Sequence, residues 1–186
     1  GLVRNRLWQL SNWHADESQS AIKLSIEVAD VPWLAQAVRL TYTVQLSAAG
    51  LSVELTTDEC FVQQAALHSY FAVSKLAESK VTGLPTKFHD KVDQSIITDA
   101  TGSCSFNAEV DRIYVDSANQ LTLHTPTSMS ILQSGHDASV VWNPGQMKGT
   151  AAADIATQWA EFVCVESATL TLQPKRLALR QQIPRC

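Results

Sequence analysis

The sequence predicts an all-β protein, built as a large antiparallel β-sandwich. Short segments in which apolar and polar residues alternate recur along the chain, and turn-forming Gly, Asn, Asp and Pro residues separate them. Segments with helical periodicity are scarce. The chain has 186 residues, of which 45% are hydrophobic and 17% are charged, so it can bury a core of ordinary size. We expect one domain that covers residues 1–186.

The strand segments follow one another at short spacing. In "AIKLSIEVAD" (21–30), Ile22, Leu24, Ile26 and Val28 alternate with mostly polar residues, which is typical of a strand with one buried face. The segment "VRLTYTVQLSAAGLSVELTTDE" (38–59) predicts a hairpin that turns at residues 47–50. Further strands are predicted in "FVQQAALHSYFAV" (61–73), "DRIYVDS" (111–117), "QLTLHTP" (120–126), "MSILQS" (129–134), "ASVVWNPG" (138–145) and "ATLTLQP" (168–174).

One short helix is predicted near residues 151–160. In "AAADIATQWAEF" (151–162), Ala152, Ile155 and Trp159 would share one face of a helix. The preceding "WNPG" (142–145) has Asn before Pro and Gly after it, which indicates a turn.

Composition argues against several classes of function. The net charge is −4 and no block of Lys or Arg is present, so we expect no nucleic-acid partner. No run of apolar residues is long enough to span a membrane, and the four cysteines form no CxxC pair. Neither HExxH nor HxH spacing occurs, so we expect no metal. We expect a monomer in a reducing, cytoplasmic setting.

His68 lies in a segment of low polarity, "ALHSYF". Strand alternation would place Ala66, His68 and Tyr70 on one face and Leu67 on the other. One interpretation is a histidine at the edge of the core that binds a backbone carbonyl group. The other is a proton donor or acceptor in a cleft.

Glu166 follows the apolar run Phe162–Val165 in "EFVCVESA" (161–168). If the strand ends at Val165, Glu166 is solvated. If Glu166 is instead held in a cleft, burial would raise its pKa and suit it to general-base catalysis.

Two further charged residues can be interpreted as having only a structural role. Asp111 begins "DRIYVDS" and could enter a strand or pair with its neighbour Arg112. Arg4, like Arg6, could be an ordinary surface cation. Pattern alone therefore indicates one histidine and one carboxylate as candidates for proton transfer, and it indicates no substrate.

Several strings taken in order resemble the glucose-6-phosphate 1-epimerase (hexose-6-phosphate mutarotase) branch of the aldose 1-epimerase superfamily. They are "GLVRNRLWQL", "ALHSYFAV", "VTGL", "DRIYVDS", "VVWNPG" and "EFVCVESA", and the resemblance runs through nearly the whole chain. It implies the galactose mutarotase-like sandwich, whose open face binds a pyranose. The family's HGxxRN motif has no histidine here, nor the family strands upstream of it, so we expect an N-terminally truncated form of that sandwich.

The resemblance also implies a reaction and roles for four residues. The reaction interconverts the α and β anomers of an aldohexose 6-phosphate by acid–base ring opening and closure, without a cofactor. Glu166 of "CVE" matches the general base and His68 of "ALHSYF" matches the general acid. Asp111 of "DRIY" matches a carboxylate that binds sugar hydroxyl groups. Arg4 of "GLVRN" matches the arginine associated with the phosphate, which a guanidinium fork suits.

Three other functions stay open at this point. The chain could be an aldose 1-epimerase that acts on free sugars. It could be a carbohydrate-binding module that keeps the fold without turnover, or a structural sandwich that binds no ligand.

Overall fold

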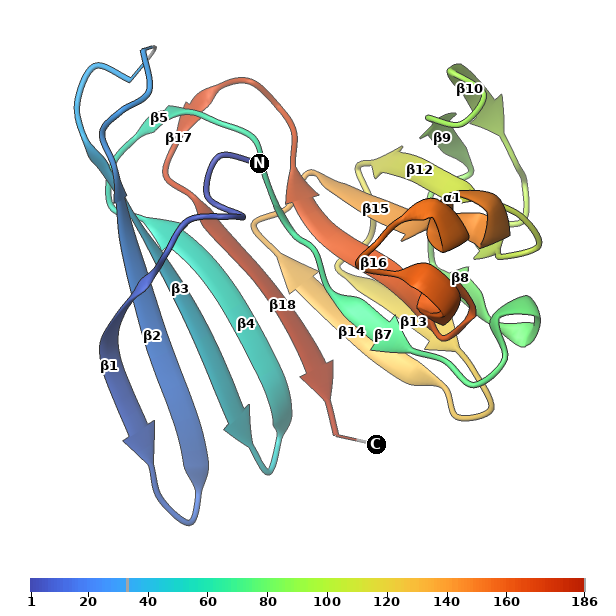
Figure 1. Cartoon of the computed structure of the whole chain (residues 1–186), viewed down its shortest axis with the longest axis horizontal. Coiled ribbons are helices and arrows are strands. Elements are labelled where there is room, and N and C mark those ends of the chain that lie inside the picture. Colours follow the sequence, from blue (N-terminus) through green and yellow to red (C-terminus); the bar gives the residue numbers. More distant parts are fainter. Residues whose placement is uncertain (33, 186) are drawn as a thin grey trace.

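The computed structural model describes residues 1–32 and 34–185, and within them the strands form two large sheets (Figure 1). The larger sheet has nine strands in the order β1-β2-β3-β4-β18-β14-β13-β8-β11. These are β1 (Gln9–Ala15), β2 (Gln19–Val28), β3 (Val38–Ser47), β4 (Gly50–Thr57), β18 (Ala178–Pro184), β14 (Met129–Ser134), β13 (Gln120–His124), β8 (Lys80–Thr82) and β11 (Ser103–Ser105).

The second sheet has seven strands, in the order β10-β9-β12-β15-β16-β6, and β7 also pairs with β16. They are β10 (Ser95–Thr98), β9 (Lys87–Asp90), β12 (Val110–Val115), β15 (Ala138–Asn143), β16 (Phe162–Thr169), β6 (Ala65–Leu67) and β7 (Tyr70–Ala72). A small third sheet pairs β17 (Pro174–Lys175) with β5 (Phe61–Val62). Neighbouring strands run antiparallel throughout, so the predicted all-β antiparallel class is confirmed.

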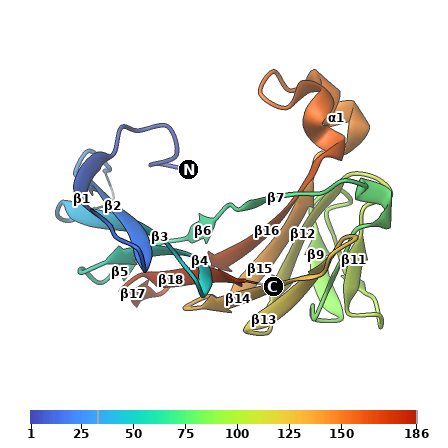
Figure 2. The ribbon, with the colours of Figure 1, turned by 90° about the horizontal axis from the view of Figure 1, so that it is seen from below.

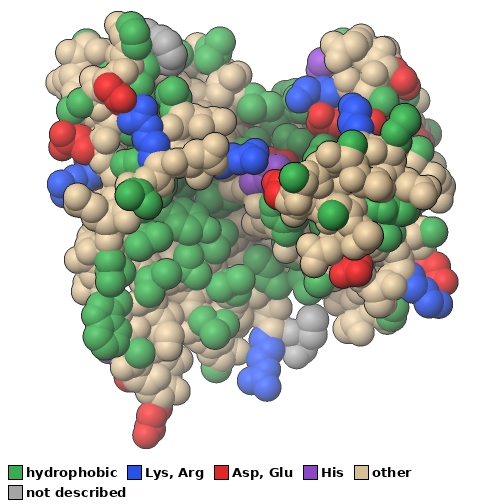
Figure 3. Space-filling view, viewed as in Figure 1, with side chains coloured by type: hydrophobic (Ala, Val, Ile, Leu, Met, Phe, Trp, Pro, Cys, Tyr) green, Lys and Arg blue, Asp and Glu red, His purple; other side chains and the backbone are tan. Residues whose placement is uncertain are grey.

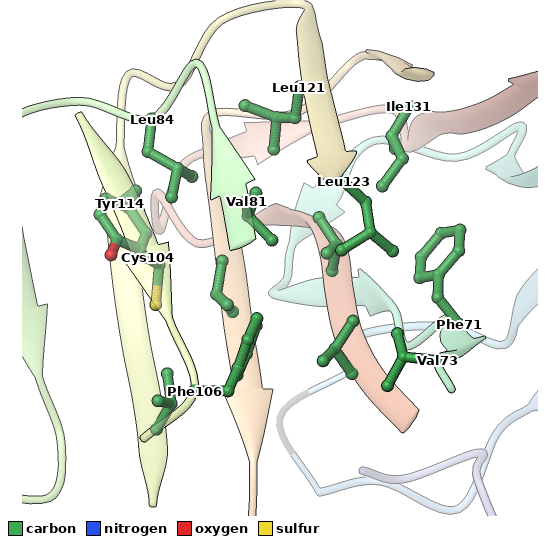
Figure 4. Close-up of a cluster of buried hydrophobic side chains, with 14 of the residues drawn as sticks. Phe71, Val73, Val81, Leu84, Cys104, Phe106, Tyr114, Leu121, Leu123 and Ile131 are labelled. Carbon is green, nitrogen blue, oxygen red and sulfur yellow. The ribbon is translucent and has the colours of Figure 1, made fainter. Parts of the chain in front are cut away.

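The two large sheets face one another in one half of the molecule and enclose its main core (Figure 2). The larger sheet contributes Val81, Leu121, Leu123 and Ile131, and the second sheet contributes a matching set from β12, β15 and β16. Figure 4 shows ten labelled members of this cluster converging between the layers. Residues of β16 that point into this core are completely buried, which fixes that strand rigidly.

The other half consists of β1 to β4 and β18, and one face of these strands is apolar. The predicted alternation in 21–30 is confirmed, because Leu24 of β2 lies opposite Tyr42 of β3, which lies opposite Leu55 of β4. Near β18 this face is covered by β6 and the chain around Trp8. Farther out, its side chains are exposed, and Figure 3 shows them as a continuous apolar surface. They include Leu10, Trp13, Ile22, Leu46 and Leu51.

The hairpin predicted for 38–59 is confirmed. β3 ends at Ser47 and β4 begins at Gly50, where Ser47 and Gly50 are paired. Gly50 has φ +126°, and a Cβ there would clash with the carbonyl oxygen of Ile183 on the adjacent β18. Only glycine therefore fits this turn.

The helix lies earlier than predicted. The α-helix α1 spans Gly145–Ala151, and a separate 3₁₀ turn, η2, spans Ala156–Ala160 within the predicted range. A further 3₁₀ turn, η1, spans Leu76–Glu78. The helix begins at "WNPG" because the Asn143 side chain accepts a hydrogen bond from the Gly145 N–H at 2.9 Å, and Gly145 adopts φ +65°.

Two predicted strands also differ from the structure. The segment 61–73 forms three short strands, β5, β6 and β7, interrupted around His68. The segment 168–174 is not a separate strand, because residues 168–169 end β16 and β17 begins only at Pro174. None of the helices in the described residues is long and apolar enough to cross a membrane.

Candidate active site

Glu166 lies inside β16 and not at its end, so the prediction of a solvated strand end is wrong. The strand continues to Thr169, and Glu166 is 7% exposed. Val163 and Val165 point into the core between the sheets. Because side chains alternate along a strand, Glu166 points to the opposite face, into an open cleft.

His68 lies between β6 and β7, directly across from Glu166. Ser167 is paired with Leu67 and Cys164 with Tyr70, so the interrupted ladder brings residue 68 beside residue 166. The Nε2 atom of His68 is 3.3 Å from Oε1 of Glu166. The buried Leu67 anchors the segment on one side, while the His68 side chain is 41% exposed and therefore accessible from the cleft.

The pKa values of the two groups are shifted in opposite directions, that of Glu166 upward and that of His68 downward. Burial raises the pKa of the Glu166 carboxyl group to about 7, the Asp111 carboxylate adds to the rise, and Lys91 opposes it. Burial is the main cause that lowers the pKa of the His68 imidazole. A backbone hydrogen bond opposes this, the positive charge of Arg4 adds to the lowering, and the Asp111 carboxylate opposes it. At pH 7 Glu166 is therefore partly protonated and His68 is mostly neutral, so both groups can exchange protons near neutral pH.

Arg4 lies at the mouth of the same cleft. The cleft has a volume of about 1400 Å³, and Arg4, His68 and Glu166 all line it. No acidic side chain in the described residues pairs with Arg4, whereas Arg6 binds Asp30 at 2.6 Å. Figure 3 shows basic, histidine and acidic side chains together at this hollow, beside the apolar surface. Arg4 is thus a cation available to an anionic ligand.

Asp111 shares the open face of the second sheet with Glu166 but does not line the cleft volume that contains Arg4 and His68. Its Oδ2 atom is 3.5 Å from Nζ of Lys91. The prediction that it could pair with Arg112 is wrong, because Arg112 points to the other face and binds Asp90 with Nε 3.0 Å from Oδ2.

Two aromatic rings contact His68 and a third packs against those two, although none was assigned a part in the site from the sequence. Tyr70 is stacked on the imidazole at 4.9 Å between ring centroids, and Trp142 meets it edge-on at 5.7 Å. Phe162 packs against both Tyr70 and Trp142. Residues 68 and 70 share one face of the predicted strand, so the sequence could have indicated that Tyr70 lies beside His68. Trp142 lay in a segment that was interpreted only as a strand and a turn. These rings fix the imidazole and offer an apolar surface on which a sugar ring can stack.

Within residues 1–32 and 34–185, no group of three His, Cys, Asp or Glu side chains could hold a metal ion. The buried Cys164 lies beside Glu166 on the same face, and burial raises its pKa, so it stays a neutral thiol.

The fold matches solved structures of mutarotase-like proteins. A structure described as a "putative mutarotase" from Salmonella typhimurium superposes with a TM-score of 0.88 and 26% identity, covering 100% of this chain and 68% of that one. Galactose 1-epimerase from Lactobacillus acidophilus superposes with a TM-score of 0.69 at 12% identity, covering 96% of this chain and 66% of that one. By fold, the chain is therefore a galactose mutarotase-like β-sandwich.

Sequence comparison assigns the family. The family model described as aldose 1-epimerase matches residues 1–176, and the chain belongs to that family. Proteins of Salmonella typhimurium and Escherichia coli, both named "Putative glucose-6-phosphate 1-epimerase", are each 27% identical over 96% and 90% of this chain, respectively. The chain spans 65% of the first protein's length and 59% of the second's.

Proposed function

We propose that the protein is an isomerase that interconverts the α and β anomers of an aldohexose 6-phosphate, with glucose 6-phosphate as the substrate. The observation that carries this proposal is the His68–Glu166 pair, 3.3 Å apart, in a cleft that also contains the unpaired cation Arg4. The names of the relatives at 27% identity support the same substrate.

Each residue has a defined part in the reaction. Glu166 removes the proton from the C1 hydroxyl group while His68 donates a proton to the ring oxygen, and the bond between C1 and the ring oxygen breaks. Rotation about the C1–C2 bond presents the other face of the aldehyde. In ring closure His68 takes the proton back from the hydroxyl group that attacks C1, and Glu166 gives its proton to the C1 oxygen, so the other anomer forms with no net change in protonation.

Substrate recognition would use the remaining groups. Arg4 binds the phosphate, because a guanidinium forms paired, charge-assisted hydrogen bonds with phosphate oxygens. Asp111 accepts hydrogen bonds from sugar hydroxyl groups. The Tyr70 and Trp142 rings pack against the apolar face of the pyranose.

The preference for a phosphorylated sugar is tested with Arg4→Gln. We expect kcat/KM for α-glucose 6-phosphate to fall at least about tenfold, because a charged hydrogen bond is lost, while kcat/KM for free glucose changes little. Arg39→Gln is the matched control, because Arg39 is an exposed arginine of β3 outside the cleft. Polarimetry on freshly dissolved α-anomers measures both rates.

Two outcomes separate the alternatives. Equal kcat/KM values for the two sugars, unaffected by Arg4→Gln, would identify an aldose 1-epimerase for free sugars. Binding of glucose 6-phosphate without any rate above the uncatalysed reaction would identify a carbohydrate-binding module.

A further inference from the structure

Two ion pairs lie on opposite faces of the second sheet, where the end of β9 and the residue after it meet the start of β12. Asp90 at the end of β9 lies opposite Arg112 of β12, and these two side chains bind each other on one face. Lys91 and Asp111 are their immediate neighbours in the chain. They meet on the other face, with Nζ of Lys91 3.5 Å from Oδ2 of Asp111.

Lys91 holds Asp111 by its backbone as well as its side chain. The Lys91 N–H donates a hydrogen bond to the Asp111 carbonyl oxygen at 2.8 Å. The preceding Asp90 is itself fixed, because it accepts a hydrogen bond from the Val92 N–H at 3.0 Å and binds Arg112. The turn that carries Lys91 is therefore anchored on both sides, and its backbone is fixed beside Asp111.

The face on which Lys91 and Asp111 meet is the face of the candidate site. Asp111 is paired with Trp142, Trp142 with Cys164, and Cys164 with Tyr70, in one row across β12, β15, β16 and β7. Glu166 lies two residues beyond Cys164 and points to the same side. Lys91 thus closes the end of the site that lies opposite the segment with His68.

We propose that Lys91 is a positioning residue of this site, which orients the Asp111 carboxylate toward the sugar hydroxyl groups and balances the negative charge of Asp111 and Glu166. The inference deepens the proposed function and rests on it for the role of Asp111. The local sequence around Lys91 does not indicate such a role.

The charges around Glu166 determine what the loss of Lys91 would do. Lys91 is the cation that lowers the pKa of Glu166, and Asp111 is the anion that raises it. Other titratable groups lie near Glu166. They are His68 and Arg4 in the cleft, Tyr70 of β7, Cys164 on the same strand, and His89, which is in the same row of the sheet on β9. None of these replaces the ammonium group beside Asp111. Removing it leaves two carboxylates with less compensation, so the pKa of Glu166 rises further.

The first test is kinetic and uses the full chain. We expect Lys91→Met to raise KM for α-glucose 6-phosphate about five- to tenfold, and Lys91→Arg to restore most of the loss. In an Asp111→Asn background, Lys91→Met should change KM less than about twofold, because the carboxylate that Lys91 orients is gone. Lys75→Met is the control, since Lys75 forms an exposed ion pair with Glu78 outside the site. Equal effects of Lys91→Met in both backgrounds would overturn the proposal.

The second test does not depend on turnover. Carbon-13 NMR of the Glu166 carboxyl group should show its titration moved to higher pH in Lys91→Met, by a few tenths of a unit to about one unit, given the partial exposure of Lys91. Lys75→Met should leave the titration unchanged. An unchanged Glu166 titration in Lys91→Met contradicts the charge-balancing role, even if the chain has no epimerase activity. If the titration moves but no activity is found, the proposed function fails and the charge-balancing part of the inference stands.

Discussion

Glu166 holds a carboxyl group inside a strand whose neighbouring residues are almost completely buried, and ionising it there costs free energy. The folded chain raises its pKa to about 7, so the folded state binds this proton more tightly than the unfolded state does. As pH rises from the unfolded pKa toward 7, the folded chain loses stability through this group, and below the unfolded pKa the loss is absent.

Replacing Glu166 should therefore stabilise the protein in a pH-dependent way. We expect Glu166→Gln to increase the free energy of unfolding at pH 8 by roughly 2–3 kcal/mol more than at pH 4.5, because glutamine cannot ionise. Urea denaturation of both proteins at the two pH values measures this difference. If the two proteins differ by the same free energy of unfolding at both pH values, the Glu166 carboxyl group titrates normally in the folded chain.

The sequence indicates which residue types could transfer protons, but it does not show that they meet. Glu166 looked solvated because the apolar run before it seemed to end the strand, whereas the continuation to Thr169 depends on pairing with β15 and β6. The 3.3 Å contact with His68 joins residues 98 positions apart in the chain (166 − 68), so no local pattern contains it. Lys91 was missed for the same reason, since its partner Asp111 lies on another strand.

At the scale of elements, Asn143 joins the end of β15 to the helical segment and to β16. It is fully buried, and its Nδ2 atom donates hydrogen bonds to the carbonyl oxygens of Trp159 at 2.9 Å and Phe162 at 2.8 Å. Its Oδ1 atom accepts the Gly145 N–H. One side chain therefore fixes α1, η2 and the start of the strand that carries Glu166.

Loss of the Asn143 side-chain hydrogen bonds should destabilise the folded protein. We expect Asn143→Ala to lower the free energy of unfolding by about 2–4 kcal/mol, because it leaves buried backbone groups without partners. Asn119→Ala, at an exposed position, should change stability by less than about 0.5 kcal/mol. Chemical denaturation compares the two variants, and similar small losses would show that Asn143 forms an ordinary turn.

Elements were predicted where alternation is clear, whereas the exposed β1, the short strands β8 to β11 and β18 were not predicted. The strands at 21–30 and 38–59 follow a simple pattern, and the structure has them as β2, β3 and β4. β18 was not predicted, because its buried Gln181 interrupts the apolar pattern. The Gln181 Nε2 atom donates hydrogen bonds to groups distant in the chain, the Val165 carbonyl oxygen and the Ser167 hydroxyl group, while its buried Oε1 atom has no partner among the described residues. The helix was predicted too late in the chain, because its start depends on the buried side chain of Asn143.

At the scale of the whole molecule, the two halves differ in how their sheets are covered. The half with β12, β15 and β16 is a closed sandwich, in which Leu121 has no exposed surface. In the half with β1 to β4, the outer part of the apolar face is open, and Leu46 is 57% exposed. The candidate site lies where the two halves meet, because Glu166 belongs to β16 of the closed half and the same cleft is lined by Leu24 and Tyr42 of the open half.

Matched leucine substitutions should measure this difference. We expect Leu121→Ala to lower the free energy of unfolding by about 2–5 kcal/mol, because it leaves a cavity in a packed core. Leu46→Ala in the 186-residue chain should change it by less than about 0.5 kcal/mol. Urea denaturation gives both values. A loss for Leu46→Ala that approaches that of Leu121→Ala would show that the open face is covered in solution.

The central claim is that His68 and Glu166 transfer the protons of anomer interconversion. The most direct test is polarimetry of freshly dissolved α-glucose 6-phosphate with the wild-type chain, Glu166→Gln and His68→Asn, after circular dichroism confirms that each variant is folded. The account predicts a wild-type rate above the uncatalysed reaction and a loss of about 10²-fold or more in kcat for each variant. Variants as fast as the wild-type chain would contradict it.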